Sequence, residues 1–171
     1  MKLDFNTIRP LTSRGNYEIT VFLSSLKDTI QRYMDRDNLT LDVDFQRGHV
    51  WNEQQQVKFV EFVLRGGASP AILLNHPNWM GSFRGDMVIV DGKQRLTALL
   101  KFLDNELEVF DGHKLNDIEN LHLSSCSILV NVNNLKTRKE VLRWYIELNE
   151  GQTPHTDEEL NKVKELLNKS K

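Results

Sequence analysis

The chain has 171 residues, enough for one domain with a buried core, and 27% of them are charged, which is ordinary for a globular protein. The net charge of −2 excludes a global basic field, so any contact with DNA or RNA must come from a local patch. The single cysteine, Cys126, excludes an internal disulfide, and the five histidines are scattered without metal-site spacing. No apolar segment has the length of a signal peptide or membrane span, which predicts a cytoplasmic protein without a membrane partner.

The first third of the chain is predicted to contain a helix, a strand and a second helix. A helix with one buried stripe is predicted for residues 16–36, where apolar side chains recur at helical spacing: Ile19, Phe22, Leu23, Leu26, Ile30, Tyr33 and Met34. A half-buried strand is predicted for residues 39–45, where the alternating apolar positions are Leu39, Leu41, Val43 and Phe45. Asn52 and Gln55 form a capping-box pattern that begins the second helix, and Gly66-Gly67 ends it.

The middle of the chain is predicted to be a hairpin. Its strands are residues 71–75 and 87–90, and a polar, glycine-punctuated segment joins them. The tip is expected to expose Trp79, Met80, Phe83 and Arg84, a set that suits stacking on a base or docking of a partner. The alternative is a tip that folds back on its own domain.

The last third is predicted to alternate between short elements and helices. After a helix that ends near residue 105, we expect a short strand at 106–110, a turn at 111–112, a short helix or irregular link at 115–123 and a strand at 126–132. Thr137 with Glu140, and Thr156 with Glu159, predict the starts of two more helices. This order predicts an α+β fold in a single domain, 1–171, with a helical lead-in (1–38), a motif-bearing core (39–135) and C-terminal helices (136–171).

Residues 88–100 are predicted to be a buried strand, a tight turn at Asp91-Gly92 and an amphipathic helix. Asp91 and Gln94 could form a capping box there. Lys93 and Arg95, however, oppose the helix dipole, because a helix N-terminus already carries partial positive charge. An anion held by free backbone N–H groups and by both side chains would compensate, so the turn predicts a phosphate site. The alternative is a solvated helix start whose cations point into water.

Three segments resemble those of a known family. They are Phe45-Gln46-Arg47 followed by Trp51, the run Asp91-Gly92-Lys93-Gln94-Arg95-Leu96-Thr97-Ala98, and residues 145–151 followed by Thr153-Pro154. They resemble the motifs of the DGQQR-type ParB/sulfiredoxin-like domain, the N-terminal part of GmrSD-type restriction enzymes that attack modified DNA. The resemblance spans residues 40–160. The chain departs from it at Lys93, where the family has glutamine, and at Glu147, where it has arginine.

The resemblance implies a ParB/sulfiredoxin-like small mixed sheet with flanking helices, and a nucleotide, ATP or GTP with Mg²⁺, held at the turn. The residues expected to hold this nucleotide are Gly92, Lys93, Gln94, Arg95, Thr97, Gln46, Arg47 and Asn149. Trp79, Phe83, Arg84 and Trp51 are the candidates for nucleic-acid contact, although a core position is the alternative for Trp51.

Phosphoryl transfer needs charge neutralisation, an acceptor in line and often a metal ion. Arg95, Lys93 and Arg47 suit the first role, and Gln94 or Gln46 could orient a water or hydroxyl. Asp91 could hold Mg²⁺ or act as general base, with Asp44 as a second candidate base. We expect Arg95 to be an exposed cation whose removal abolishes nucleotide binding and hardly alters folding stability.

The family context that the resemblance implies, more than the residues themselves, favours an NTP-dependent kinase that phosphorylates a hydroxymethylated pyrimidine in DNA, as in the hypermodified genome of a bacteriophage. The alternative is an NTP-binding or NTP-hydrolysing sensor or decoy subunit, since the chain shows no H-N-H-type nuclease spacing of its own. A DNA-binding regulator of the ParB sort fits a net charge of −2 least well. The expected partners are a nucleotide, DNA with modified bases, and a protein partner or a second copy of the chain.

Overall fold

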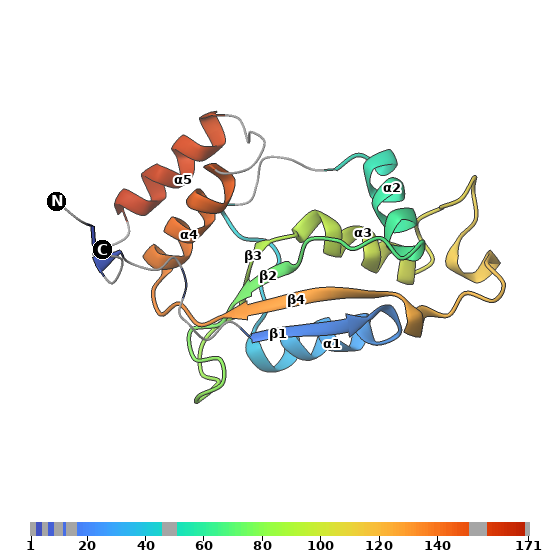
Figure 1. The fold of residues 1–171 in the computed structure, drawn as a ribbon, viewed down its shortest axis with the longest axis horizontal. Coiled ribbons are helices and arrows are strands. Elements are labelled where there is room, and N and C mark those ends of the chain that lie inside the picture. Colours follow the sequence, from blue (N-terminus) through green and yellow to red (C-terminus); the bar gives the residue numbers. More distant parts are fainter. Residues whose placement is uncertain are drawn as a thin grey trace.

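A four-stranded mixed sheet in the order β1-β4-β2-β3 forms the centre of the structure, a computed structural model that describes residues 3–4, 7–8, 12, 17–45, 51–150 and 157–169. β1 (Tyr17–Phe22) runs antiparallel to β4 (Ser127–Asn133), and β4 runs parallel to β2 (Ile72–Asn75). β2 runs antiparallel to β3 (Val88–Asp91), as in the predicted hairpin. The predicted α+β fold with a small mixed sheet is confirmed (Figure 1).

Five helices and two short 3-10 turns accompany the sheet in the described part of the chain. They are α1 (Leu23–Asp37), α2 (Glu53–Leu64), α3 (Lys93–Leu103), η2 (Leu115–Asp117), η3 (Leu123–Ser125), α4 (Arg138–Glu150) and α5 (Asp157–Lys169). In Figure 1, α1 and α3 lie behind the strands, α2 lies beside α3, and α4 and α5 pair at one end of the sheet. None of the described helices is both long and apolar enough to cross a membrane.

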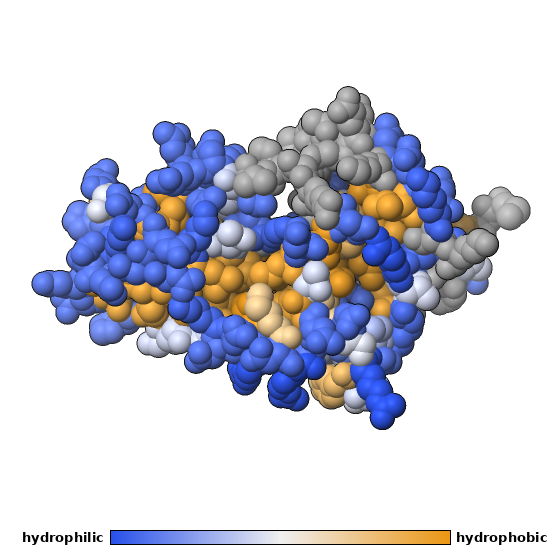
Figure 2. Space-filling view, turned by 180° about the vertical axis from the view of Figure 1, so that it is seen from behind, coloured by the Kyte–Doolittle hydropathy of each residue, from blue (hydrophilic) through white to orange (hydrophobic). Residues whose placement is uncertain are grey.

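The two faces of the sheet differ in how they are covered. The face toward α1 and α3 is apolar and buried, and its residues are Val21, Ile72, Leu74, Ile128, Val130 and Val132. On the opposite face Thr20, Phe22 and Leu129 are exposed, and no described helix lies in front of β1 and β4 in Figure 1. From behind, apolar side chains form a band across the molecule, bordered by polar ones (Figure 2).

The predicted helix over residues 16–36 is wrong at its start. Residues 17–22 form β1, which pairs with β4 along its whole length, and only from Leu23 onward is the chain helical. The apolar residues Ile19 and Phe22 fit a helical period by coincidence, because Ile19 and Val21 also alternate with polar neighbours at the strand period. The N-terminal lead-in therefore contributes an edge strand to the central sheet.

Two predicted strands are not formed. In residues 39–45 only Thr40 makes a β-bridge, to Val88, and the following residues bend and turn, although Leu39, Val43 and Phe45 are buried. The alternating apolar residues of this segment are buried in the core. The segment forms no strand, however, because β3 is only four residues long and provides no further backbone partners for it. Residues 106–110 likewise contain only the isolated bridge from Val109 to His113.

The capping boxes predicted at the starts of α2 and α4 are both formed. Asn52 accepts from the backbone N–H of Gln55, and Gln55 accepts from that of Asn52, each at 2.9 Å. Thr137 Oγ1 accepts from the N–H of Glu140 at 3.3 Å, and Glu140 Oε2 accepts from that of Thr137 at 3.1 Å. α2 ends before Gly66-Gly67, also as predicted. Thr156 lies outside the described residues.

Replacing Asn52 by alanine is expected to lower the free energy of unfolding by about 1 kcal/mol, because a backbone N–H of α2 loses its acceptor. Asn52→Asp, which keeps an acceptor oxygen, is the control and should stay close to the wild type. Urea unfolding followed by circular dichroism measures both. Equal losses in the two variants would show that the cap contributes nothing.

Candidate functional site

The turn between β3 and α3 depends on Gly92. Its φ is +91°, in the left-handed region that side chains disfavour. A Cβ added there would lie 2.7 Å from Ile72 Cδ1 and 3.2 Å from Ile72 Cα, so the backbone of β2 passes directly against the turn. Only glycine allows both the backbone conformation and this close approach.

The predicted capping box of Asp91 and Gln94 is wrong. Asp91 is the last residue of β3, and the N-cap position is occupied by Gly92, which has no side chain to accept a hydrogen bond. Asp91 instead pairs with Arg95, while Gln94 Oε1 accepts from the backbone N–H of Trp51 at 3.2 Å. The first backbone N–H groups of α3 are therefore left without the usual side-chain cap.

Arg95 is not the exposed cation that the sequence predicts. The residue is only 9% exposed; its Nη2 donates to Asp91 Oδ2 at 2.6 Å and its Nη1 donates to the Pro70 carbonyl at 3.0 Å. The guanidinium thus joins α3, the end of β3 and the segment that leads into β2. The planar fork of arginine allows this double contact, which no periodicity argument could have shown.

Lys93, the first residue of α3, forms a second ion pair at the turn. Its Nζ lies 3.1 Å from Asp42 Oδ1, and the Asp42 side chain is 79% exposed. Such an exposed pair contributes little energy, so this cation can exchange partners at low cost. Sequence reasoning missed Asp42, although its polar position among the alternating residues 39–45 marked it as solvent-facing.

Gln94 and Gln56 hold the backbone of Trp51 from two sides. Trp51 donates its N–H to Gln94, and Gln56 Nε2 donates to its carbonyl at 3.0 Å. The Trp51 ring is partly buried, 5.3 Å from the ring of Phe59. Gln56 was also missed, because a glutamine inside a helix is ordinarily solvated.

Two neighbouring residues at the start of α3, Lys93 and Gln94, contact the chain before and after positions 46–50. Asp42, before this segment, pairs with Lys93, and Trp51, after it, bonds to Gln94. Gln46 and Arg47, two of the predicted site residues, fall in this segment and lie outside the described residues.

The other residues predicted from the motifs bond elsewhere. Asp44 Oδ2 lies 2.5 Å from Arg138 Nη2 at the start of α4, and Asn149 Nδ2 donates to the Tyr145 carbonyl of its own helix at 2.6 Å. Thr97 is partly buried in α3. The rings of Phe45 and Tyr145 are 5.1 Å apart, so the first and third family motifs touch through these residues.

Trp79 folds back onto the domain, which is the alternative left open for the hairpin tip. Its ring lies 5.8 Å from those of Tyr17 and Tyr33 and 5.4 Å from that of Phe83. Burial, and then the neighbouring Tyr17, raises the pKa of the Tyr33 phenol, which stays protonated at neutral pH. Phe83 and Arg84 are exposed, but the tip lies at the opposite end of the hairpin from Asp91.

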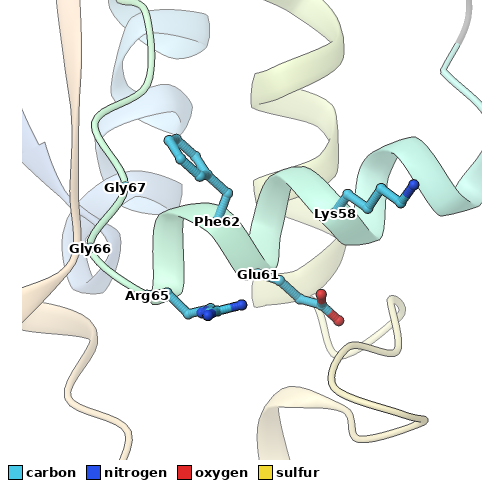
Figure 3. Close-up of a pocket in the computed structure, with 6 residues that line it drawn as sticks. All are labelled: Lys58, Glu61, Phe62, Arg65, Gly66 and Gly67. Carbon is cyan, nitrogen blue, oxygen red and sulfur yellow. The ribbon is translucent and has the colours of Figure 1, made fainter.

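A pocket of about 540 Å³ lies at the C-terminal end of α2, far along the helix from Trp51. Its lining residues are Lys58, Glu61, Phe62, Arg65, Gly66 and Gly67. In Figure 3, Glu61 and Arg65 extend from the same side of α2, while Phe62 points the opposite way. Glu61 Oε1 accepts from the backbone N–H of Phe110 at 2.7 Å, so its carboxylate anchors the 105–125 connection.

Within the described ranges, no three His, Cys, Asp or Glu side chains gather in a way that could hold a metal ion. Mg²⁺ in nucleotide sites is usually bound by one or two carboxylates together with substrate phosphates and water. Asp91, whose side chain is 43% exposed beside the uncapped helix start, fits that pattern as the protein's carboxylate.

Gly92→Ala is expected to destabilise the fold more than Gly112→Ala, which serves as the matched control. Both glycines have a positive φ, but a Cβ at Gly112 would meet its nearest atom only at 3.9 Å. The difference in the free energy of unfolding should be about 2 kcal/mol, the typical cost of overpacking. Similar losses would mean that Ile72 can move away from the turn.

Arg95→Met is expected to lower the free energy of unfolding by about 2 kcal/mol, because Asp91 and the Pro70 carbonyl lose a charged donor. Lys93→Met breaks only an exposed pair and should cost less than about 1 kcal/mol. Urea unfolding of both variants tests this. Unchanged stability of Arg95→Met would restore the solvated-cation interpretation.

Comparison with known proteins identifies the family. Neither curated proteins nor solved structures gave a match to the chain. A family model described as the N-terminal domain of the GmrSD restriction endonuclease matches residues 26–169, which include the Asp91–Arg95 turn and all five helices except the first residues of α1. Because this match covers most of the chain, the protein belongs to the family of GmrSD restriction endonuclease N-terminal domains.

Proposed function

We propose that the chain binds a nucleoside triphosphate, ATP or GTP with Mg²⁺, at the Asp91–Arg95 turn, and transfers its γ-phosphoryl group to a hydroxyl in DNA. The observation that carries the proposal is the uncapped start of α3, where glycine occupies the N-cap and Lys93 the first helical position. Free backbone N–H groups, the helix dipole and an exchangeable cation together favour a phosphate group at this place.

The side chains at the turn have different proposed roles in phosphoryl transfer. Lys93 would leave Asp42 and neutralise charge on the phosphate oxygens. Arg95 is buried, so its proposed role is to position Asp91 rather than to clamp a phosphate. Thr97 and Asn149 are proposed to support the site through hydrogen bonds.

The transfer step is one in-line displacement. The acceptor hydroxyl oxygen forms a bond to the γ-phosphorus, its proton passes to the Asp91 carboxylate, and the bond to the β–γ bridging oxygen breaks so that the nucleoside diphosphate leaves. Mg²⁺ would supply charge neutralisation on the phosphates. The alternative role for Asp91 is to bind Mg²⁺ together with the substrate phosphates and water.

The proposed acceptor is a hydroxymethylated pyrimidine base in DNA. The support for DNA comes from the family, whose description names a restriction endonuclease. A hydroxymethyl group provides the alcohol that the transfer step requires, and ordinary thymine lacks it. Phe83 and Arg84 at the exposed hairpin tip are proposed to contact the DNA.

A nucleotide sensor is the second candidate function, and one observation favours it. Lys93 bonds to Asp42 and Gln94 bonds to Trp51, so a ligand that displaces Asp42 from Lys93 would break a contact between the turn and a distant part of the sequence. Arg47 and Gln46 are proposed as further contacts of the phosphates. In that case the chain would report bound nucleotide, or its slow hydrolysis, to a separately encoded nuclease.

The deciding experiment follows the label of γ-labelled ATP and GTP with Mg²⁺ and DNA that contains either thymine or a hydroxymethylated pyrimidine. The kinase predicts label only on the modified DNA, and the sensor predicts free phosphate or bound, intact nucleotide. Lys93→Glu should reduce nucleotide affinity at least about tenfold, since it places an anion beside the phosphates.

Lys27→Glu is the matched control for this variant, because Lys27 also forms an ion pair with an exposed aspartate, Asp104. It should bind nucleotide like the wild type. Equal loss in the two lysine variants would mean that net charge, not the turn, controls binding. The absence of binding to any triphosphate in the wild type would overturn the proposal.

A further inference from the structure

Two asparagines of β4 lie on the face of the sheet opposite α1 and α3. Across the strands, Glu18 pairs with Asn131, Asn131 with Leu73, and Leu73 with Asp91, so these four side chains share one face. Asn133, two residues further along β4, points to the same face and pairs with Asn75. Polar side chains at Asp91 and Asn131 therefore lie on one face of the sheet, with Leu73 between them.

Asn131 and Asn133 carry buried polar atoms that have no hydrogen-bond partner. Asn133 is 1% exposed, and neither its Oδ1 nor its Nδ2 has a partner; the Oδ1 of Asn131 is also buried and unpaired. Unpaired buried polar atoms each cost about 1–3 kcal/mol, and native structures contain few of them.

Asn75 shows that the surrounding structure can satisfy such an amide. It lies on the same face, beside Asn133, and both of its amide atoms bond to the backbone of Leu135, at 2.9 and 3.1 Å. The chain thus completes the hydrogen bonds of a structural asparagine at this level of the sheet. The described residues provide no such partner for the unpaired atoms of Asn131 and Asn133.

A nucleobase has the matching chemistry. Asparagine pairs with a base through one donor and one acceptor side by side. The two asparagines offer two acceptors and one donor, and guanine presents two donors and one acceptor along one edge. Leu73, partly exposed between Asn131 and Asp91, provides an apolar surface on which the face of the base can rest.

The spacing agrees with the length of a nucleotide. Neighbouring strands are about 4.8 Å apart, so Asn131 lies two strand spacings, about 10 Å, from Asp91 along the sheet. That span separates the phosphates of a nucleotide from the hydrogen-bonding edge of its base. A phosphate at the start of α3 and a base over Leu73 are therefore compatible.

We propose that Asn131 and Asn133 are specificity-determining residues that read the base, guanine, of the nucleotide bound at the turn. This inference rests on the nucleotide site proposed above. Asn131 is partly exposed as a residue, although its Oδ1 is buried, and Asn133 is buried on the same face.

The test is calorimetric titration of the full chain with each of GTP, ATP, CTP and UTP in the presence of Mg²⁺. The wild type should bind GTP at least about tenfold more tightly than the others, the discrimination typical of one good amide–base pair. Asn131→Leu and Asn133→Leu should each reduce that preference to less than about threefold while keeping triphosphate affinity. Ser127→Ala, on the same face of β4 but remote from Asp91, should keep the wild-type preference.

The outcomes separate this inference from the function on which it rests. A wild type that binds no triphosphate overturns both. A wild type that binds all four equally, or a preference unchanged in both Leu variants, overturns the inference alone and shows that the amides hold internal water. A preference for another base that is lost in the variants supports base reading and overturns the assignment of guanine. If Asn133→Leu fails to fold, the nucleotide preference of Asn131→Leu alone tests the inference.

Discussion

The contact of Gly92 with β2 is the constraint on which the rest of the structure depends. Because a Cβ at this position would meet Ile72, the chain can turn from β3 into α3 here only without a side chain. The Arg95 guanidinium then holds the turn closed by bonding to Asp91 and to the Pro70 carbonyl. These contacts fix the start of α3 relative to β2 and β3, the hairpin that carries the edge of the sheet.

The two cations of the turn have different roles because they differ in burial. The pair of Arg95 with Asp91 is largely shielded on the arginine side, and breaking it would leave a carboxylate without its donor. The pair of Lys93 with Asp42 is open to water and contributes little, so its cation is available to a ligand at low cost. Because Arg95 stays paired with Asp91, the geometry of the turn is preserved when Lys93 exchanges Asp42 for a ligand.

The sheet shows the same division between structure and function. Its face toward α1 and α3 contains only apolar side chains among the buried strand positions, and this face forms the core. Its other face contains Asp91, which pairs with Arg95, and also Asn131 and Asn133, whose unpaired polar atoms are costly to bury. A sheet that needed only stability would have apolar residues there, so the asparagines indicate a ligand on this face.

The sequence by itself determined the elements whose information is local: the capping boxes at Asn52 and Thr137, the β2–β3 hairpin, the Asp91-Gly92 turn and the family motifs. Tertiary structure decided what depends on distant partners. Residues 17–22 became a strand because β4 lies beside them, and residues 41–45 formed none because β3 is short. The sequence placed Arg95 correctly in the first turn of α3, yet its burial depends on Pro70, twenty-five residues away. Local rules describe a residue and its neighbours along the chain, whereas burial and pairing are set by residues that folding brings together.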